Sequence, residues 1–371
     1  MKIRSVDVFA YVVRYAHGDY VMSGGRATPT QDGTLVRLRT DEGLEGWGEV
    51  TTLGATYLPA FAGSVHAALA HLAPVVVGED PTNLARINTL MNAVLLDHQF
   101  AKSAVDIACW DLFGKSVGRP IVDLLGGRLQ EDFPLYEAVP LGSSESMVEF
   151  VQERMAAGLN RFQLKVGNDP ADDIARVRAT RAAIPEDTVL IADANTGWTL
   201  LGARRAIRGL ADLDVYVEQP CRSTADCILA HRGSTLPLIL DESVLTAEDL
   251  HEAKFSGAVG VNLKISRLGG LTKTARLRDA AQDLNLSMCL EDTWGGDIIS
   301  AAVSHLAAGT RRQNLLHVSF FNDWTDGHVA GHAPRSINGR GAAPDGPGLG
   351  IQVDERLVGE LLFSEEGSRP T

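Results

Sequence analysis

The chain has few cysteines and little positive charge. Four cysteines occur in 371 residues, and 34 Lys and Arg are outnumbered by 47 Asp and Glu, which gives a formal net charge of −13. Nucleic acids and anionic membranes demand a basic face, so this balance argues against both as partners. The cysteines are scattered, and the spacing of Cys221 and Cys227 matches no common zinc pattern. We therefore expect reduced thiols in a cytoplasmic protein.

Long apolar runs are also missing. No run reaches the ~18 residues that a membrane-spanning helix needs, so no membrane span is expected. The first 13 residues alternate apolar and polar side chains, which is typical of a strand. No continuous apolar core leads from them to a small-residue cleavage site, so no signal peptide is expected. Histidine is absent from the ends of the strand-like runs, which argues against a metal hydrolase with His-x-His ligands.

The apolar content, 45% of the residues, is enough for a large core. A barrel of ~250 residues would leave room for a second, smaller domain. Residues 3–13, 34–40 and 43–50 predict an antiparallel meander, and the polar, Gly-rich residues 16–32 predict a mobile loop. Residues 101–112 carry apolar side chains at steps of four, three and four, which predicts one apolar face of a helix.

Strand-like and helix-like runs alternate from residue 128 onward. The strand-like runs lie at residues 134–140, 162–167, 189–195, 215–220, 238–243, 260–266, 286–292 and 315–321. Eight parallel strands close a barrel. We therefore predict an N-terminal α+β capping domain over residues 1–127, completed by the C-terminal segment 336–371, and a barrel over residues 128–335.

Three acids end consecutive strand-like runs, and a lysine flanks them on each side. Asp193, Glu218 and Asp241 are 25 and 23 residues apart. Lys165 precedes the first acid by 28 residues, and Lys264 follows the last by 23. One strand, one helix and two loops take roughly that many residues, so the five side chains are expected together at the C-terminal mouth of a barrel. Individually, such acids commonly cap helices and such lysines form salt bridges.

Converging carboxylates repel one another unless a hard divalent cation, Mg²⁺ above all, binds them. The second and sixth strands lie on opposite sides of the mouth, so Lys165 and Lys264 would address opposite faces of one substrate carbon. One would remove a proton and the other would deliver one. A free lysine titrates near ~10.4, so the base is expected to have a pKa lowered by burial and neighbouring positive charge.

Together these residues make the chain resemble the enolase superfamily, in its muconate-lactonizing-enzyme-like branch. The resemblance spans nearly the whole length, and besides the three acids it is carried by GLEGWGE (43–49), AKSAVDIACWDLFGK (101–115), DLLGG (123–127), LKVG (164–167), NLKISRLGG (262–270) and DGPGLGI (345–351). It implies an α/β fold, a modified TIM barrel (β/α)7β with an α+β capping domain. It also implies one Mg²⁺ per subunit, a homo-oligomer, and removal of a proton α to a carboxylate through an enediolate.

The seventh strand separates the branches of this superfamily. The mandelate-racemase-like branch places a catalytic histidine there, and this chain has none. The other branch usually carries Lys-x-Lys on the second strand, whereas this chain has Gln163 in place of the outer lysine. Tuning of Lys165 is then left to Mg²⁺ and Lys264.

A narrower resemblance is to enzymes of proline derivatives, namely cis-3-hydroxy-L-proline dehydratases and the 2-epimerases of proline and hydroxyproline betaines. It is carried by the runs SGGR (23–26), GATYLPA (54–60), EQPC (218–221) and EDTWGGDI (291–298). The first two favour the dehydratases and the last favours the epimerases. We predict dehydration, with epimerisation or racemisation of an amino-acid derivative as the alternative, since both start with the same proton removal.

The predicted substrate contacts lie in the capping loops and after the seventh strand. They are Tyr20, Tyr57, Asp292, Thr293 and Trp294. Trp294 and Asp292 are expected to hold a cationic nitrogen, although the indole could instead pack beneath the cap and each tyrosine could serve packing alone. Asn195, Glu242 and Gln163 are expected to support these groups by hydrogen bonds, and Asn195 and Glu242 could instead be loop residues without a role. A catalytically inactive binding protein remains a further alternative.

Overall fold

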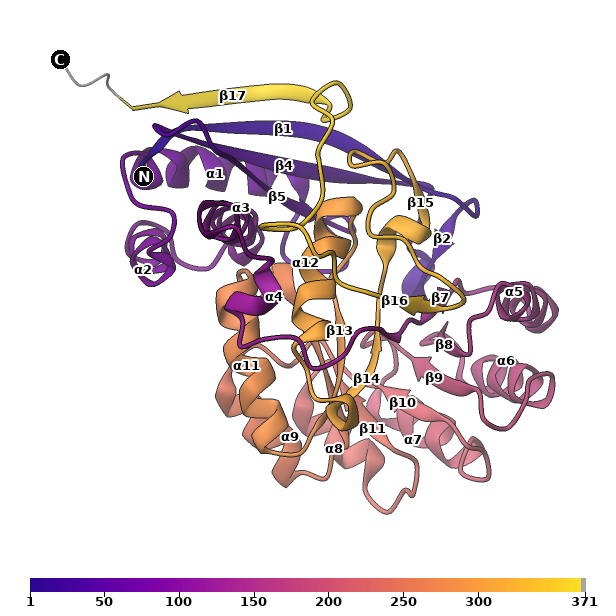
Figure 1. The fold of residues 1–371 in the computed structure, drawn as a ribbon. Helices are drawn as coiled ribbons and strands as arrows, with labels where there is room; N and C mark the ends of the chain where they lie inside the picture. Colours follow the sequence, from indigo (N-terminus) through magenta and orange to yellow (C-terminus); the bar gives the residue numbers. More distant parts are fainter. Residues whose placement is uncertain (368–371) are drawn as a thin grey trace.

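The computed structural model describes residues 1–367, and it combines a barrel with an antiparallel sheet that lies over one end (Figure 1). The sheet is built on the long strands β1 (Ile3–Tyr15), β4 (Thr30–Thr40) and β5 (Glu45–Thr51). The meander predicted from residues 3–50 is therefore confirmed. Two later strands pair with β1 on its other side, β15 (Thr325–Asp326) and β17 (Glu360–Glu366).

Two helices pack against this sheet, α1 (Ala62–Val76) and α3 (Gln99–Val117). The helix α2 (Leu84–Val94) packs on both of them, and the short α4 (Ile121–Leu124) follows α3. The helix α3 lies directly on β5, and the glycines of that strand make this possible. A Cβ at Gly48 would lie 1.8 Å from the backbone oxygen of Ala104, so only glycine permits this approach.

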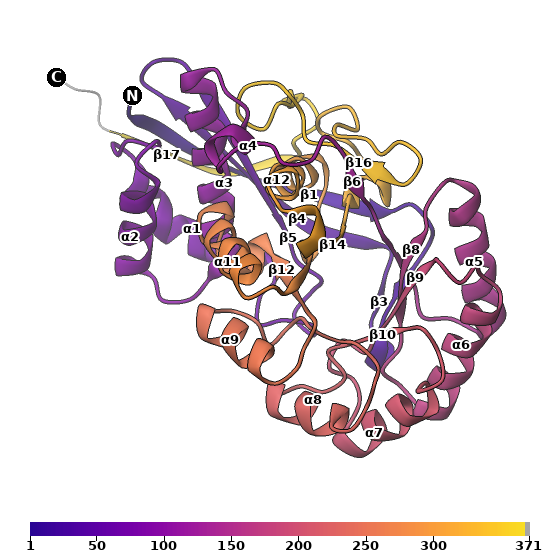
Figure 2. The ribbon, with the colours of Figure 1, turned by 60° about the horizontal axis from the view of Figure 1, so that its bottom comes forward.

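The barrel consists of eight parallel strands in chain order (Figure 2). They are β7 (Glu137–Val139), β8 (Arg161–Lys165), β9 (Val189–Asp193), β10 (Tyr216–Glu218), β11 (Leu238–Leu240), β12 (Gly260–Lys264), β13 (Ser287–Glu291) and β14 (Leu315–Val318). A parallel bridge between Leu135 and Val318 closes the ring. Each predicted strand-like run overlaps one of these strands, and the predicted barrel with its capping sheet is confirmed.

Seven helices connect the barrel strands and surround them. They are α5 (Ser144–Ala156), α6 (Pro170–Ala182), α7 (Leu200–Gly209), α8 (Thr224–His231), α9 (Ala247–Phe255), α11 (Leu271–Asp283) and α12 (Asp297–Ala308), with an extra turn α10 (Ile265–Leu268) after β12. Five of them begin where a side chain accepts a hydrogen bond from a first-turn N–H, and these caps are Ser143, Asp169, Thr199, Ser223 and Thr246. Strands covered by helices on all sides are apolar almost throughout.

The segment predicted as a mobile loop, residues 16–32, contains structure of its own. The short strands β2 (Tyr20–Val21) and β3 (Ala27–Thr28) pair with each other, and β4 begins at Thr30. Tyr20 is buried. The loop prediction is therefore wrong for these strand residues, and the mobility of the segment stays a prediction.

The C-terminal segment runs from the barrel back to the sheet of β1. Its strand β17 pairs antiparallel with Ser5 to Ala10 of β1. Residues 368–371 of the predicted completing segment 336–371 lie outside the described residues. The domain limits that we predicted remain predictions.

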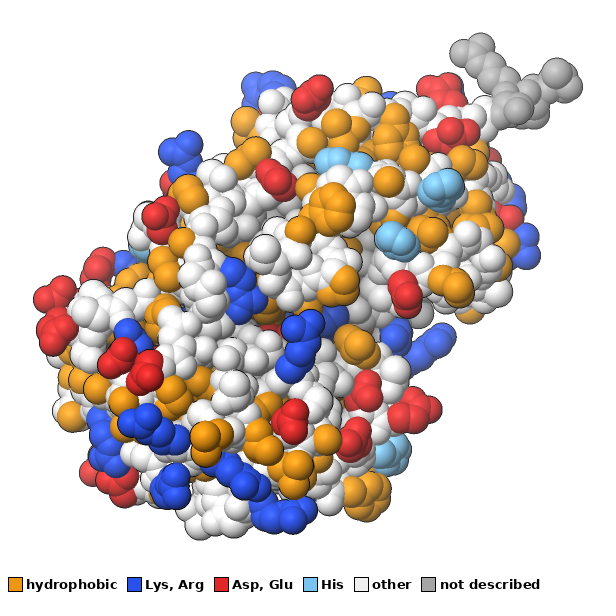
Figure 3. Space-filling view, turned by 180° about the vertical axis from the view of Figure 1, so that it is seen from behind, with side chains coloured by type: hydrophobic (Ala, Val, Ile, Leu, Met, Phe, Trp, Pro, Cys, Tyr) orange, Lys and Arg blue, Asp and Glu red, His pale blue; other side chains and the backbone are white. Residues whose placement is uncertain are grey.

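Acidic and basic side chains are interspersed with apolar ones on the face in Figure 3. None of the helices formed by residues 1–367 combines the length and apolar character that a membrane crossing requires.

Candidate active site

Strand register brings the predicted lysines and acids into one ring at the C-terminal mouth of the barrel. Lys165 of β8 is the register partner of Asp193, and Asp193 is the partner of Glu218. Across the barrel, Lys264 of β12 is the partner of Glu291. These side chains are buried, which makes their mutual charges count strongly.

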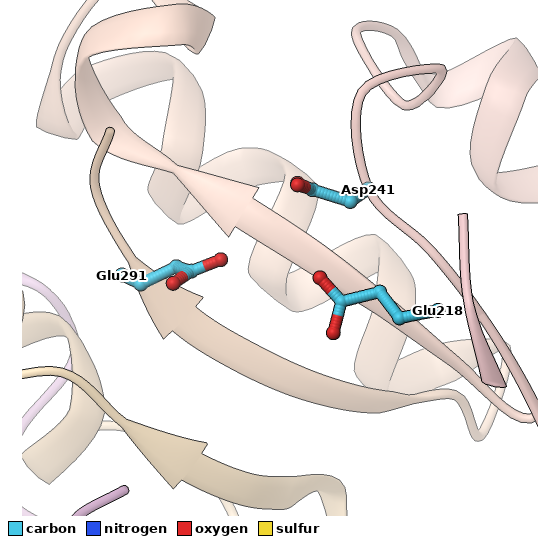
Figure 4. A group of neighbouring side chains, drawn as sticks. All are labelled: Glu218, Asp241 and Glu291. Carbon is cyan, nitrogen blue, oxygen red and sulfur yellow. The ribbon is translucent and has the colours of Figure 1, made fainter. Parts of the chain in front are cut away.

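Three of the buried acids form a compact carboxylate cluster. Oxygens of Glu218, Asp241 and Glu291 lie within 4.8 Å of one another (Figure 4). Burial, and after it the charges of Asp193 and Asp241, raise the pKa of Glu218 well above its usual range. A donor set made only of carboxylate oxygens suits a hard divalent cation, whose charge would relieve this repulsion. The acidic cluster is therefore capable of binding a metal ion such as Mg²⁺.

The cluster differs in membership from the predicted trio. Glu291, which the sequence prediction did not include, is the third acid. The predicted ligand Asp193 lies beside Glu218 in register but makes a salt bridge to Lys165, with Oδ2 2.5 Å from Nζ. Asp193 thus connects the carboxylates to the first lysine.

Asp241 is held by two cations. Its Oδ1 lies 2.7 Å from Nη1 of Arg267, and its Oδ2 lies 2.8 Å from Nζ of Lys264. Burial would raise the pKa of Asp241, but the positive charges of Arg267 and Lys264 outweigh it and hold the pKa at about 2. Asp241 is therefore ionised at neutral pH, as a metal ligand must be.

Lys165 is fixed by two acceptors on neighbouring positions. Its Nζ donates to Oε1 of Gln163 at 2.7 Å and to Oδ2 of Asp193 at 2.5 Å. Burial lowers the pKa of Lys165, but the charges of Asp193, Tyr20 and Glu218 together outweigh burial, and the net direction is upward. This is opposite to the lowering that we expected, because the carboxylates dominate the local field. A cation bound by these carboxylates would offset that field.

Lys264 occupies the corresponding position on the other side. Its Nζ lies 3.4 Å from Oε1 of Glu291 and 3.3 Å from the hydroxyl of Tyr57, in addition to Asp241. Burial lowers the pKa of Lys264, and the charges of Asp241 and Glu291 raise it further than burial lowers it. Both lysines are therefore cationic in this arrangement.

One small cavity collects nearly all the predicted contacts. It is lined by both lysines and by Tyr20, Tyr57, Gln163, Asn195, Asp292, Thr293 and Trp294, among others. Its volume of about 20 Å³ accommodates little more than one water molecule. A ring-sized substrate therefore enters only when a capping side chain moves.

The residues after β13 lie as predicted at this cavity, but their polar groups are used differently. Asp292 accepts hydrogen bonds from the backbone and hydroxyl of Ser266 and from the backbone of Thr293. Burial raises the pKa of Asp292 to about 7. Both of its oxygens are thus engaged within the loop, whereas a carboxylate opposing a substrate cation would present a free oxygen.

Trp294 packs beneath the cap, which was one alternative considered from the sequence, and its contact with a cationic nitrogen stays a prediction. Its ring packs against Tyr20, with centroids 4.7 Å apart, and also against Phe321 and Trp324. The same ring lines the cavity, and its Nε1 has no acceptor within residues 1–367. The indole is therefore at once packed beneath the cap and available to a ligand.

The capping loop is tied to the barrel through Glu242. Its Oε1 accepts from the hydroxyl of Tyr57 at 2.8 Å and from Nδ2 of Asn195 at 3.1 Å. Asn195 adopts a left-handed backbone conformation, with φ of 42°. Gln163 donates its amide to Glu218 at 3.0 Å. The three predicted supporting residues thus hydrogen-bond to groups at the mouth.

Four residues at the site escaped the sequence prediction. They are Tyr136, Asn262, Arg267 and Glu291. Asn262 bridges the cluster by donating to Glu218 at 2.7 Å and to Glu291 at 2.8 Å. The position of Asn262 two residues before Lys264 was a usable signal, because alternate strand residues share a face.

Comparisons with known proteins agree with this geometry. A family model of the enolase C-terminal domain-like family matches residues 146–357, and one of the mandelate racemase/muconate lactonizing enzyme N-terminal domain matches residues 6–126. A cis-3-hydroxy-L-proline dehydratase from Roseibium aggregatum is 42% identical over 97% of this chain and 98% of its own. An N-succinyl-L-Arg/Lys racemase from Bacillus cereus is 27% identical over 99% of both chains.

A solved structure shows the same architecture. The crystal structure of a mandelate racemase/muconate lactonizing enzyme from Roseovarius nubinhibens complexed with magnesium superposes with a TM-score of 0.94. The two chains are 35% identical, and the match covers 98% of this chain and 100% of that one. The matching family models, the curated relatives and this fold all lead to one assignment. The chain belongs to the enolase superfamily of enzymes, in its mandelate racemase/muconate lactonizing enzyme group.

Proposed function

We propose that this enzyme removes water from cis-3-hydroxy-L-proline, beginning with the proton α to the carboxylate. The observation that carries the proposal is the pair Lys165 and Lys264, which line one cavity from β8 and β12, four strands apart in a closed ring of eight. Two amines on opposite sides of one cavity suit a reaction with an acid on one face and a base on the other. The identity to the Roseibium aggregatum dehydratase supports the choice of substrate.

Asp193, Glu218 and Asp241 would hold one Mg²⁺, with Glu291 beside them. When bound, this cation supplies positive charge that stabilises the substrate carboxylate as the α proton leaves. Arg267 keeps Asp241 ionised and oriented through its 2.7 Å contact. Gln163 and Asn262 orient Glu218 by donating amide hydrogens to its oxygens.

The two lysines would carry the protons of the elimination. One lysine, as the neutral amine, takes the α hydrogen, and the Cα–H electron pair becomes the Cα=Cβ double bond. The Cβ–O bond breaks as the other lysine, as ammonium, gives its proton to the departing hydroxyl, which leaves as water. The α hydrogen and the hydroxyl of the cis isomer lie on opposite ring faces, as the lysines do. The enamine product then tautomerises to the cyclic imine acid.

The same residues would also invert the α carbon, which is the second candidate function. Reprotonation of Cα from the opposite face gives racemisation or 2-epimerisation of proline betaine, hydroxyproline betaine or another amino-acid derivative. Its specific support is the 27% identity to the Bacillus cereus racemase over nearly the whole chain. The two functions differ only in whether the second lysine reaches Cβ–OH or Cα.

The substrate ring is proposed to lie against Trp294, with Tyr20 and Tyr57 above it and Asp292 and Thr293 at its edge. Buried free thiols, among them Cys109 and Cys289, support the cytoplasm as the location. A homo-oligomer is also proposed, and light scattering of the purified chain would test it.

Incubation with cis-3-hydroxy-L-proline and Mg²⁺ in D₂O tests the reaction. Mass spectrometry and NMR are expected to show a product lighter by one water, identified as the cyclic imine acid. L-Proline, which has no hydroxyl to lose, is expected to undergo only α-hydrogen exchange. Clean inversion of a proline betaine without water loss from the hydroxyproline would instead establish the second candidate. Failure of all these substrates to exchange the α hydrogen would reject the proposal.

A further inference from the structure

A second cavity, of about 240 Å³, lies beside the barrel at the seam between β7 and β14. In the part of the chain that the structure describes, no α-helix follows β14, and the segment from Phe321 to Gly341 lies there instead. This segment and α5 lie on the same side of the barrel in Figures 1 and 2. The cavity is far larger than the about 10–15 Å³ that one water requires. Because no α-helix within residues 1–367 covers the junction of β7 and β14, the cavity there is large enough for a ligand.

A buried acid, Glu137, lines this cavity. Glu137 is the first residue of β7, and the preceding Tyr136 donates its hydroxyl to Glu291 inside the barrel. Glu137 is only 3% exposed, and its Oε1 accepts no hydrogen bond from residues 1–367. This oxygen lies 3.5 Å from Nε2 of His17, an imidazole whose pKa is lowered by burial, so the two do not form an ion pair at neutral pH. Burial raises the pKa of Glu137 to about 8. Glu137 is therefore largely protonated at neutral pH while the cavity is empty, and a cationic group bound beside it would favour its ionised form.

Two arginines line the same cavity without neutralising this acid. Arg154 of α5 has a buried Nε that lacks an acceptor among the described residues, and its Nη2 pairs with Glu153 rather than Glu137. Arg335 makes no ion pair within residues 1–367. The other acid of the cavity, Asp323, is already paired with His332 at 2.8 Å. The cavity therefore offers one acid that makes no ion pair with an arginine, together with guanidinium donors that lack an acceptor in the described part of the chain.

The remaining wall is apolar and aromatic. Phe320, Tyr136 and Trp324 contribute rings, and the last two meet edge to face with centroids 5.5 Å apart. Tyr136 and Trp324 also line the active-site cavity, so the two cavities are separated by these rings. An apolar wall between groups of opposite charge suits a small ligand that has an apolar part and carries one positive and one negative charge.

We propose that this cavity is a second, non-catalytic binding site for a small zwitterionic amino acid. The carboxylate binds Arg154 and Arg335, the cationic nitrogen binds Glu137, and the apolar body lies against Phe320 and Trp324. Arginine suits a carboxylate because its donors form a planar fork. The inference stands on this cavity alone and does not depend on the proposed reaction.

Isothermal titration of the Mg²⁺-loaded full chain with L-proline tests the site. Glu137→Gln and Arg154→Met are expected to weaken one binding component by at least about tenfold, the effect of losing a hydrogen bond to a charged group. Arg178→Met is the matched control, because this arginine pairs with Asp212 on the surface and lies outside the cavity. It is expected to leave binding unchanged. Lys165→Ala, which alters only the active site, is expected to keep the same component.

Single-charge probes sharpen the test. Cyclopentanecarboxylate and pyrrolidine each lack one charge and are expected to bind this component at least about tenfold more weakly than L-proline. Arg154 is on a helix surface, with a side chain 19% exposed, so its variant is expected to fold even if Glu137→Gln proves unstable by thermal unfolding. L-Proline binding that is absent from the wild type, or is unchanged in both variants, would overturn the proposal. Absence of water loss from hydroxyproline would reject only the reaction.

Discussion

Replacement of His305 by Gln is predicted to remove a defined part of the pH dependence of stability. His305 lies on α12, is fully buried, and connects three parts of the chain. Its Nδ1 accepts from the backbone of Val122 at 3.3 Å, and its Nε2 lies 3.0 Å from the backbone oxygen of Leu349, to which it donates. The contact with Val122 requires the neutral imidazole, because a protonated Nδ1 cannot accept a hydrogen bond, and burial lowers the pKa of His305 from 6.5 to about 4.

The two pKa values give the sign and size of the effect. Between pH 4 and 6.5, His305 is protonated in the unfolded chain but remains neutral in the folded chain. The folded state therefore loses stability as the pH falls. For pKa values of 6.5 and about 4, proton linkage gives a loss of about 2 kcal/mol between pH 7 and pH 5. In the variant, this contribution is absent. The variant is expected to be less stable than the wild type at pH 7, by about 1–2 kcal/mol for the lost contacts, and to approach it at pH 5.

Urea unfolding followed by circular dichroism at pH 5, 6, 7 and 8 measures this difference. Excess EDTA in every sample removes metal binding as a separate source of pH dependence. Gln retains an amide near the position of Nε2, which limits the loss of packing. Parallel stability curves for wild type and variant across this pH range would show that His305 does not titrate as argued.

The other predictions concern the active site. Lys165→Ala and Lys264→Ala are each expected to lower kcat by at least ~10², a typical size for loss of a general acid or base, and near-native turnover in both would exclude the two-face mechanism. Asp241→Asn is expected to abolish turnover while circular dichroism shows a folded chain, and full activity of the wild type in excess EDTA would contradict the metal site. Trp294→Leu is expected to raise KM for cationic substrates about tenfold, near the ~1–2 kcal/mol of a partly desolvated cation–π contact, whereas an unchanged KM would exclude that contact.

The positions of the lysines and acids along the chain were predictable because each is the last residue of a strand or, for Asp241, the residue directly after one. The interval of one strand and one helix recurs in the sequence, and parallel strands bring those ends to the same edge. Lys165, Asp193 and Glu218 accordingly form consecutive register partners. The order and direction of all eight strands followed from the same repeat.

The sequence could not decide which of two adjacent acids faces inward. Glu291 and Asp292 both end the seventh strand-like run, and a shift by one residue exchanges the two faces of a strand. In the structure, Glu291 lies beside Lys264, whereas Asp292 accepts a hydrogen bond from the backbone of Ser266. The orientation depends on register with β12, which is a contact between residues distant in sequence. For the same reason, the salt bridge between Arg267 and Asp241 could not be predicted from a strand pattern. Arg267 lies in the short helix α10, outside the strands.

The pairing of β17 with β1 joins residues near opposite ends of the chain. During synthesis, β1 is made first. The edge of β1 that pairs with β17 stays unpaired until the last part of the chain has been synthesised. At about 5–20 residues per second this interval is on the order of 20–70 s. An unpaired strand edge can pair with other chains during that time. Ribosome-bound intermediates and chains truncated before Glu360 are therefore expected to depend more on chaperones than the complete protein does.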